Sequence, residues 1–191
     1  MAVAYEPIKP VKHLRPGTST PSVIRQKEAA TQTFKEGVPV ALASGYVQEC
    51  AFGGSEKVYG ISAEAGHNLT AAGTAQETSE ATPPNQPSAK TIPHGSWVKD
   101  GKIMVFRPSD EQLFSAMLKD GQVFTVALVS ETRYALIKDG TSGYWYIDNT
   151  DSGTNDEHAA QILGVDDQSP NTVAGGARVI FKIASAARFA A

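Results

Sequence analysis

The fold class of this chain is decided by the segment YALIKDGTSGYWYI, residues 134–147. Two short runs rich in branched and aromatic residues flank a polar turn with two glycines, a pattern typical of two strands joined as a hairpin. Side chains alternate along a strand, so Tyr144 and Tyr146 share one face and Trp145 lies on the other. Packing of this aromatic run into a core is the first interpretation, and Tyr144 and Trp145 as interface anchors are the alternative.

Strand-like runs also occur on both sides of this segment. They lie at residues 34–42, 46–50, 57–63, 96–106, 123–129 and 177–183. Asp100-Gly101 divides the fourth run and is a strong hairpin signal, while Pro39 in the first favours an edge position or a bulge. These short strands, separated by turns, predict an all-β fold.

One short helix is expected at residues 109–119. Ser109 has Gln112 three residues later, which matches a capping box, and Gly121 is suited to a C-terminal cap. The apolar side chains between them recur at helical spacing: Leu113, Phe114, Met117 and Leu118. The predicted fold is therefore all-β with one helix.

Residues 1–30 are predicted to form an extended arm. Prolines at positions 7, 10, 16 and 21 argue against a helix or a central strand there. The arm carries the candidate interface residues Tyr5, Lys9, Lys12, His13, Leu14 and Arg15. A mobile terminus is the ordinary interpretation of such a segment, and an arm that becomes ordered on a partner is the functional one.

Residues 31–191 are predicted to form a single β-rich domain, because the chain length suits one domain with its own core. A surface loop at about residues 70–90 is expected to interrupt it, since Ala, Thr, Ser, Glu and Pro predominate there. Loops of this length tend to be functional or mobile. Trp97, which follows this loop, is a third candidate interface aromatic.

Composition and charge argue against several functions. The chain has 17 Lys plus Arg and 20 Asp plus Glu, a net charge of -3, which attracts neither nucleic acid nor an acidic membrane. Membrane insertion and export are not expected, because no run approaches the roughly 18 apolar residues of a span and the first ten residues lack a secretory pattern. The single cysteine, Cys50, allows no internal disulfide, which fits intracellular assembly.

No catalytic, cofactor-binding or metal-ligating set is expected. The histidines are scattered without metal-ligand spacing: His13, His67, His94 and His158. Residues 148–157 are acidic, but in a calcium-loop spacing Ala159 takes the position of the bidentate glutamate. Residues 151–154, Asp-Ser-Gly-Thr, resemble the aspartic-protease loop, but they occur once and follow a polar stretch. Cys50 has no base beside it in sequence.

Two parts of the chain resemble phage capsid proteins. Residues 34–40 and 58–68 resemble the early part of capsid decoration proteins, in which a Gly-x-Pro-Val strand precedes a Gly-Ile-Ala-x-Glu strand. Residues 134–148 more specifically resemble phage structural cement proteins, and residues 162–166 and 177–181 fit the same pattern. The resemblance covers most of residues 34–181, and the loop at 70–86 departs from the shorter family members.

The resemblance implies a β-sandwich or jelly-roll-like domain on the capsid exterior, between capsomers of the major capsid protein. It implies a structural, non-enzymatic role: a clamp that binds the mature lattice stabilises the expanded shell by mass action. The implied partners are the major capsid protein and further copies of this chain, in a trimer or alternatively a dimer. The arm would lie along the shell or against a neighbouring copy.

Two other classes of function remain open from sequence. A carbohydrate- or receptor-binding β-module of a virion or cell surface would use Trp97, Tyr144 and Trp145 as stacking platforms. A hydrolase would require the Asp151 loop or Cys50 to act.

Overall fold

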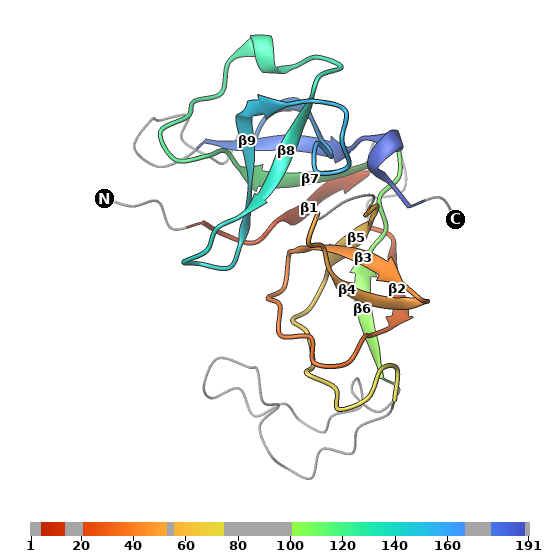
Figure 1. Ribbon diagram of the computed structural model, residues 1–191. Helices are drawn as coiled ribbons and strands as arrows, with labels where there is room; N and C mark the ends of the chain where they lie inside the picture. Colours follow the sequence, from red (N-terminus) through yellow and green to blue (C-terminus); the bar gives the residue numbers. More distant parts are fainter. Residues whose placement is uncertain (1–4, 14–20, 53–55, 75–100, 167–176, 190–191) are drawn as a thin grey trace.

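A computed structural model describes residues 5–13, 21–52, 56–74, 101–166 and 177–189. Within these ranges the chain forms two antiparallel sheets and two single-turn 3-10 helices (Figure 1). The all-β prediction is confirmed. No helix in the described part of the chain is long or apolar enough to cross a membrane.

The first sheet has six strands, and its two outer regions meet. In spatial order the strands are β1 (Lys9–His13), β7 (Gln112–Met117), β11 (Arg178–Ile183), β10 (Ala160–Val165), β8 (Arg133–Lys138) and β9 (Trp145–Ser152). Leu118, just after β7, forms a parallel bridge with Ile147 of β9, and the Lys119 amide donates to the Ile147 carbonyl at 2.9 Å. The sheet is therefore rolled, and these bonds cover the outer edge of β9.

The second sheet has five strands and is closed in the same way. Its spatial order is β2 (Val23–Lys27), β6 (Lys102–Phe106), β5 (Val58–Ser62), β3 (Pro39–Ala43) and β4 (Tyr46–Glu49). Glu28, just after β2, forms a parallel bridge with Val47 of β4, and the Ala29 amide donates to the Val47 carbonyl at 2.8 Å. An extension of one strand again covers an outer edge.

One hydrophobic core joins the two sheets. Phe114 and Phe181 of the first sheet and Ile61 and Ile103 of the second are fully buried and belong to the same cluster. Complete burial of each such side chain contributes about 1.5–3 kcal/mol. This packing of two sheets is consistent with the predicted sandwich, while the jelly-roll strand order stays a prediction.

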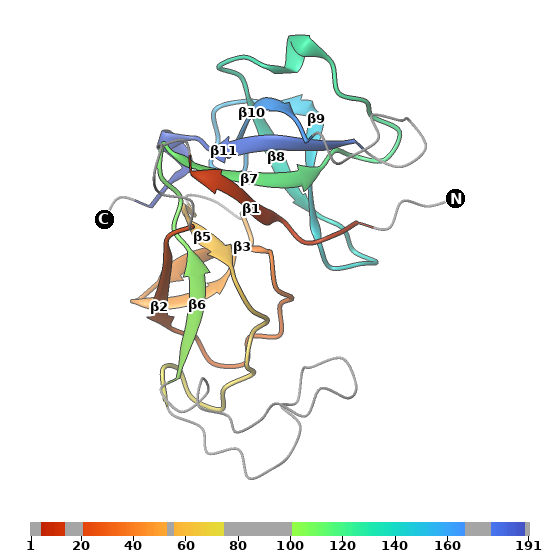
Figure 2. The ribbon, with the colours of Figure 1, turned by 180° about the vertical axis from the view of Figure 1, so that it is seen from behind.

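The C-terminal segment fastens one sheet to the other. After the 3-10 helix η2 (Ser185–Ala187), Arg188 forms a parallel bridge with Val58 of β5, and the Phe189 amide donates to the Val58 carbonyl at 3.0 Å. The Lys57 ammonium pairs with Asp156 and donates to the Ala186 carbonyl. Figure 2 shows this C-terminal segment running from the end of β11 beside the second sheet.

The helix predicted at residues 109–119 is wrong, because β7 occupies this segment. The Ser109 hydroxyl does accept bonds from the amides of Glu111 and Gln112, but these bonds form a turn that precedes a strand. All residues of β7 are buried. A strand buried on both faces has apolar residues on both, so hydrophobic periodicity does not distinguish its short sequence from that of a helix.

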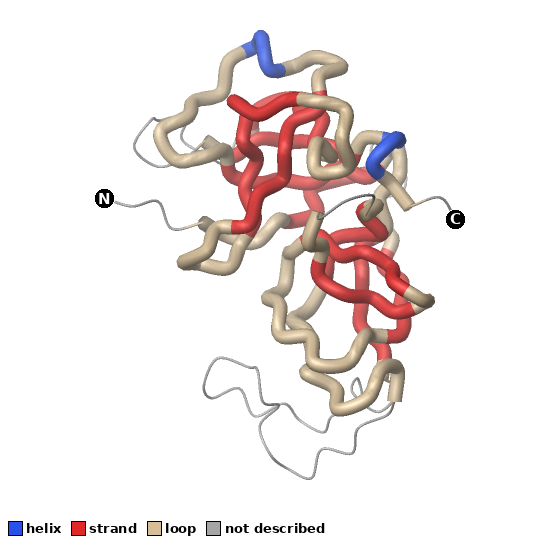
Figure 3. The backbone as a smooth tube through the Cα atoms, in the orientation of Figure 1, coloured by secondary structure: helices blue, strands red, loops and turns tan. Residues whose placement is uncertain are grey.

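The strand predicted at residues 123–129 is also wrong. This segment contains the 3-10 helix η1 (Val126–Leu128) within an exposed loop, and Val126 is 80% exposed. Figure 3 shows η1 at the end of the molecule farthest from the five-stranded sheet. Phe124 and Leu128 pack partly against the core, but among the described residues no strand pairs with this segment, so its β propensity does not produce a strand.

The described part of the predicted arm is extended and is built into both sheets. Strand β1 pairs with β7 at the edge of the first sheet, and β2 pairs with β6 at the edge of the second. Edge positions suit the prolines, which cannot donate to a ladder. Most of the loop predicted at residues 70–90, and the first half of the hairpin at 96–106, lie outside the described residues.

Candidate functional site

Tyr5, the first candidate interface residue, contacts its own chain. Its ring stacks on Tyr146 of β9 with centroids 4.6 Å apart, and its hydroxyl accepts a bond from the Asp120 amide at 2.9 Å. Burial raises the pKa of both tyrosines. The contacts hold the N-terminal segment over the closure between β7 and β9.

The remaining arm candidates are distributed along β1 and beyond it. The Lys9 ammonium is exposed and lies 3.3 Å from the Glu6 carboxylate. Lys12 and His13 belong to β1 through their backbones, while Leu14, Arg15 and the aromatic Trp97 lie outside the described residues.

Arg178 of β11 ties the start of the arm to the first sheet. Its guanidinium donates to the Glu6 carboxylate at 3.0 Å, to the Pro7 carbonyl at 3.1 Å and to the backbone carbonyl of Ser115 at 3.1 Å. Desolvation lowers the pKa of this guanidinium. Charge-assisted bonds of this kind are the stronger hydrogen bonds in proteins.

The aromatic run of β9 alternates as predicted, with Trp145 in the core. Trp145 is 4% exposed, packs edge-on against Phe52 with centroids 5.3 Å apart, and donates its indole N–H to the Glu49 carboxylate at 3.0 Å. Tyr144 is partly exposed, and the Lys35 ammonium lies 4.6 Å from its ring centroid. Trp145 therefore packs into the core of this chain, and its role at an interface stays a prediction.

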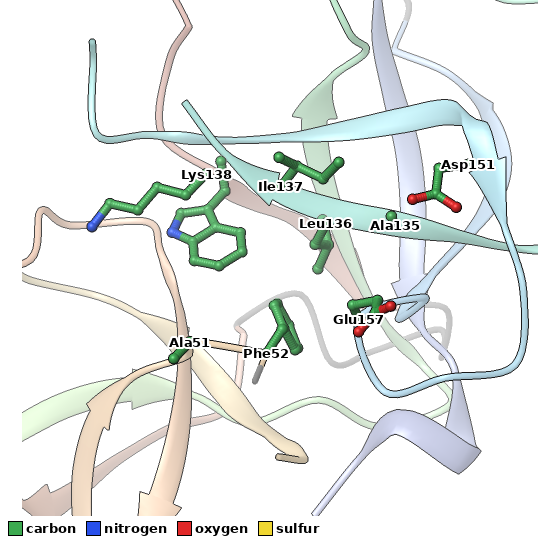
Figure 4. A pocket seen from close by; sticks show the side chains of 9 residues that line it. Ala51, Phe52, Ala135, Leu136, Ile137, Lys138, Asp151 and Glu157 are labelled. Carbon is green, nitrogen blue, oxygen red and sulfur yellow. The ribbon is translucent and has the colours of Figure 1, made fainter. Parts of the chain in front are cut away.

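A pocket of about 290 Å³ opens beside Trp145, between β8 and the connection from β4 to β5. Its lining consists of Ala51, Phe52, residues 135–138 of β8, Trp145, Asp151 and Glu157. Figure 4 shows Phe52 and Leu136 in its middle, Lys138 at one end, and Asp151 and Glu157 at the other. The Lys138 ammonium pairs with the Glu49 carboxylate at 2.7 Å, so its charge is already balanced.

The Asp-Ser-Gly-Thr motif lies at the end of β9, with Asp151 and Ser152 as the last residues of the strand. The exposed Asp151 carboxylate lies 3.0 Å from His158 Nε2, so its partner is an imidazole and not a second carboxylate. Gly153 packs against the same ring, because a Cβ atom at this position would lie 2.9 Å from His158 Cε1. The geometry lacks the proton-sharing carboxyl pair that aspartic-protease chemistry requires.

Asp148, at the start of the acidic segment, is held as an anion by its neighbours. Burial raises its pKa, but bonds from the Lys119 ammonium at 2.7 Å and from Thr150 outweigh this effect and keep the pKa below its ordinary value. No group of three or more metal-ligating side chains occurs among the described residues.

Cys50 has the environment of a structural thiol. Cys50 directly follows β4 and is buried. Burial, followed by the charges of Glu56 and Glu49, raises the pKa of the thiol well above its ordinary value. A nucleophilic cysteine requires the opposite shift.

A buried carboxylate–imidazole pair was missed by the sequence analysis. Glu28 is fully buried, and its carboxylate accepts the His67 amide at 2.7 Å and lies 2.5 Å from His67 Nδ1. The pair joins the closure of the second sheet to the loop after β5. Nothing in the sequence indicates it, because the two residues are 39 positions apart and follow no motif.

Comparisons with known proteins identify no family. No family model matches the chain, and no curated protein matches it significantly. Among solved structures the chain is similar to one described as pre-mature bacteriophage phi29 gene product 12, with a TM-score of 0.39 and 12% identity. The match covers 93% of this chain and 22% of that one. At these values it establishes neither a common fold nor a common function.

Proposed function

We propose that this chain is a capsid cement protein, which binds the outside of a tailed-phage shell between capsomers of the major capsid protein and stabilises the expanded state. One observation carries the proposal: the separate segments that resemble decoration and cement proteins are neighbours in space. Residues 34–40 include the first two residues of β3, Pro39 and Val40, which pair with Ile61 and Gly60 of β5 in the segment 58–68, and residues 134–148 span most of β8 and the first half of β9, which pair as a hairpin. Residues 162–166 and 177–181 pair as β10 and β11.

Two glycines of the resembling segments occupy positions where a side chain does not fit. Gly37 has φ +72°, and a Cβ atom there would lie 2.5 Å from Pro7 Cβ and 2.7 Å from the Ile8 carbonyl oxygen. A Cβ at Gly60 would lie 2.6 Å from the Phe106 carbonyl oxygen. The resembling residues therefore have a definite task in the fold, which is to let neighbouring strands and the N-terminal segment approach closely.

The construction of the molecule suits a clamp. The C-terminal bridge and ion pairs such as Lys57–Asp156 hold the two sheets together, and the closures fix the edges of each sheet. A rigid body loses little conformational entropy when it binds, so more of its contact energy remains for stabilising the shell. The role includes no catalytic step, and repeated binding by a trimer or a dimer would add avidity.

Co-sedimentation of the full-length protein with expanded capsids tests the proposal. We expect saturable binding to expanded shells, weak binding to unexpanded ones, and a higher temperature of shell disruption when the protein is bound. Absence of binding to expanded shells would refute the cement function.

The role of the arm requires substitutions and not a deletion. Removing residues 1–22 would also remove β1 and the buried Ile8, which is 2% exposed, so the fold itself would be damaged. The variant Lys9→Ala with Lys12→Ala changes only side chains of β1, and Lys182→Ala, in β11 and outside the arm, is the control. Unchanged binding by the double variant would contradict an arm contact with the shell.

Among the described residues, the carbohydrate- or receptor-binding alternative receives no comparable support, and its third candidate, Trp97, lies outside them. Trp145 is buried, and the exposed ring face that sugar stacking requires is restricted at Tyr144 by Lys35 and at Tyr146 by Tyr5.

A further inference from the structure

We propose that the pocket between the two sheets accepts one basic side chain, arginine or lysine, from a protein partner. The pocket lies at the junction of the two sheets, where Phe52 from the second sheet's β4–β5 connection faces β8 of the first. Its walls are already formed in the free protein, so binding requires little rearrangement.

The walls suit the aliphatic part of such a side chain. Phe52 and Leu136 form an apolar middle section of the pocket (Figure 4). Arginine and lysine commonly lay their methylene groups along apolar surface while their charged ends remain in a polar environment. The aromatic ring of Phe52 adds a cation–π attraction for a head group that passes over it.

The charged end of the pocket is negative. Glu157 lines it, and its backbone is fixed there because its carbonyl accepts the amides of Leu136 at 3.0 Å and Ala159 at 2.8 Å. Asp151 lines the same end and is about half exposed, with His158 as its neighbour. Lys138 lies at the opposite end and is neutralised by Glu49.

This combination selects one occupant. An anion would meet Asp151 and Glu157, and a sugar would find no free indole face, because Trp145 is 4% exposed. A metal ion would require a third ligand, and the described residues offer no such cluster. Charge complementarity together with apolar walls favours a long cationic side chain. That the partner is the capsid shell rests on the proposed function. That the pocket accepts a basic side chain rests on the pocket lining alone.

Nuclear magnetic resonance of the full-length protein tests the pocket with a defined probe, N-acetyl-arginine amide. We expect chemical-shift changes at Phe52, residues 135–138 and the Trp145 indole N–H, which weaken as salt is added. The isosteric neutral probe N-acetyl-citrulline amide should produce less than about a third of this response. Equal responses to both probes, or arginine shifts elsewhere on the molecule, would overturn the proposal.

Variants separate the pocket from the function. Glu157→Gln should weaken arginine binding about fivefold and Glu157→Lys should abolish it, whereas the exposed Glu131→Gln, which makes the same chemical change away from the pocket, should have no effect. If wild-type protein and Glu157→Lys bind expanded capsids equally, the pocket is not the contact with the capsid and the cement function stands. If the wild type binds arginine but no capsids, the cement function fails and the pocket stands.

Discussion

Replacing Gly37 with alanine tests whether the close passage of the N-terminal segment limits this position. Gly37 has φ +72°, and an added Cβ would lie 2.5 Å from Pro7 Cβ and within 2.9 Å of two backbone atoms of Ile8. Gly45, in the hairpin between β3 and β4, has φ +85° but nothing within 4 Å of such a Cβ. The two substitutions therefore share the backbone strain and differ only in the contact.

The magnitudes follow from these two contributions. Alanine in the left-handed region costs about 1–2 kcal/mol, and the loss of unfolded-state entropy returns about 0.4–1 kcal/mol. Gly45→Ala should therefore destabilise by about 1 kcal/mol. At Gly37 the overlap with Pro7 and Ile8 adds about 1–3 kcal/mol, because backbone atoms cannot rotate away as a side chain can.

Chemical denaturation, monitored by circular dichroism, measures the unfolding free energy of both variants. We expect Gly37→Ala to lose about 2–4 kcal/mol of unfolding free energy and to become more sensitive to proteolysis before β1, since the bond from the Ile8 amide to the Gly37 carbonyl at 3.1 Å is lost. Equal destabilisation by Gly37→Ala and Gly45→Ala would refute the reasoning that close approach matters here.

Three further predictions concern buried or charged groups. Glu28→Gln should destabilise by about 1–3 kcal/mol in denaturation experiments, because it replaces the buried carboxylate that accepts the His67 amide and faces His67 Nδ1, while exposed Glu36→Gln should change stability by less than about 0.5 kcal/mol. The lowered pKa of Asp148 contributes stability above about pH 4 that is lost as the pH falls through the folded-state value, so Asp148→Asn should flatten the acid limb of the stability curve; parallel limbs would contradict this. Cys50 should react with a thiol reagent only after unfolding, since burial raises its pKa; rapid reaction of the native protein would show an open site.

Local sequence determined the hairpin of β8 and β9 and the alternation within it. Its strands are joined by a short polar turn, in which the Asp139 carboxylate accepts the Ser142 amide at 2.6 Å. The two strands that pair in this hairpin are neighbours in sequence, so the local pattern was sufficient to predict it. The same holds for the distribution of the β9 aromatics, because alternation along a strand depends on backbone geometry alone.

Only the tertiary structure decided the state of residues 109–119 and 123–129. The first segment has the signals of a helix but is a buried strand, because β1 and β11 pair with it on both sides and supply its backbone hydrogen bonds. Residues 123–129 have the composition of a strand, but no strand of the described chain pairs with them. Burial and partners override weak local preference in both cases.

The sequence by itself therefore determined the all-β class and the short hairpin, where the interacting residues are close along the chain. The closure of each sheet, the Glu28–His67 pair and the pocket between the sheets bring together residues tens of positions apart. Such contacts depend on how the chain folds back on itself, and no local pattern specifies which distant residue will arrive. Tertiary packing alone decided that Trp145 faces the core and that Glu157 faces an open pocket.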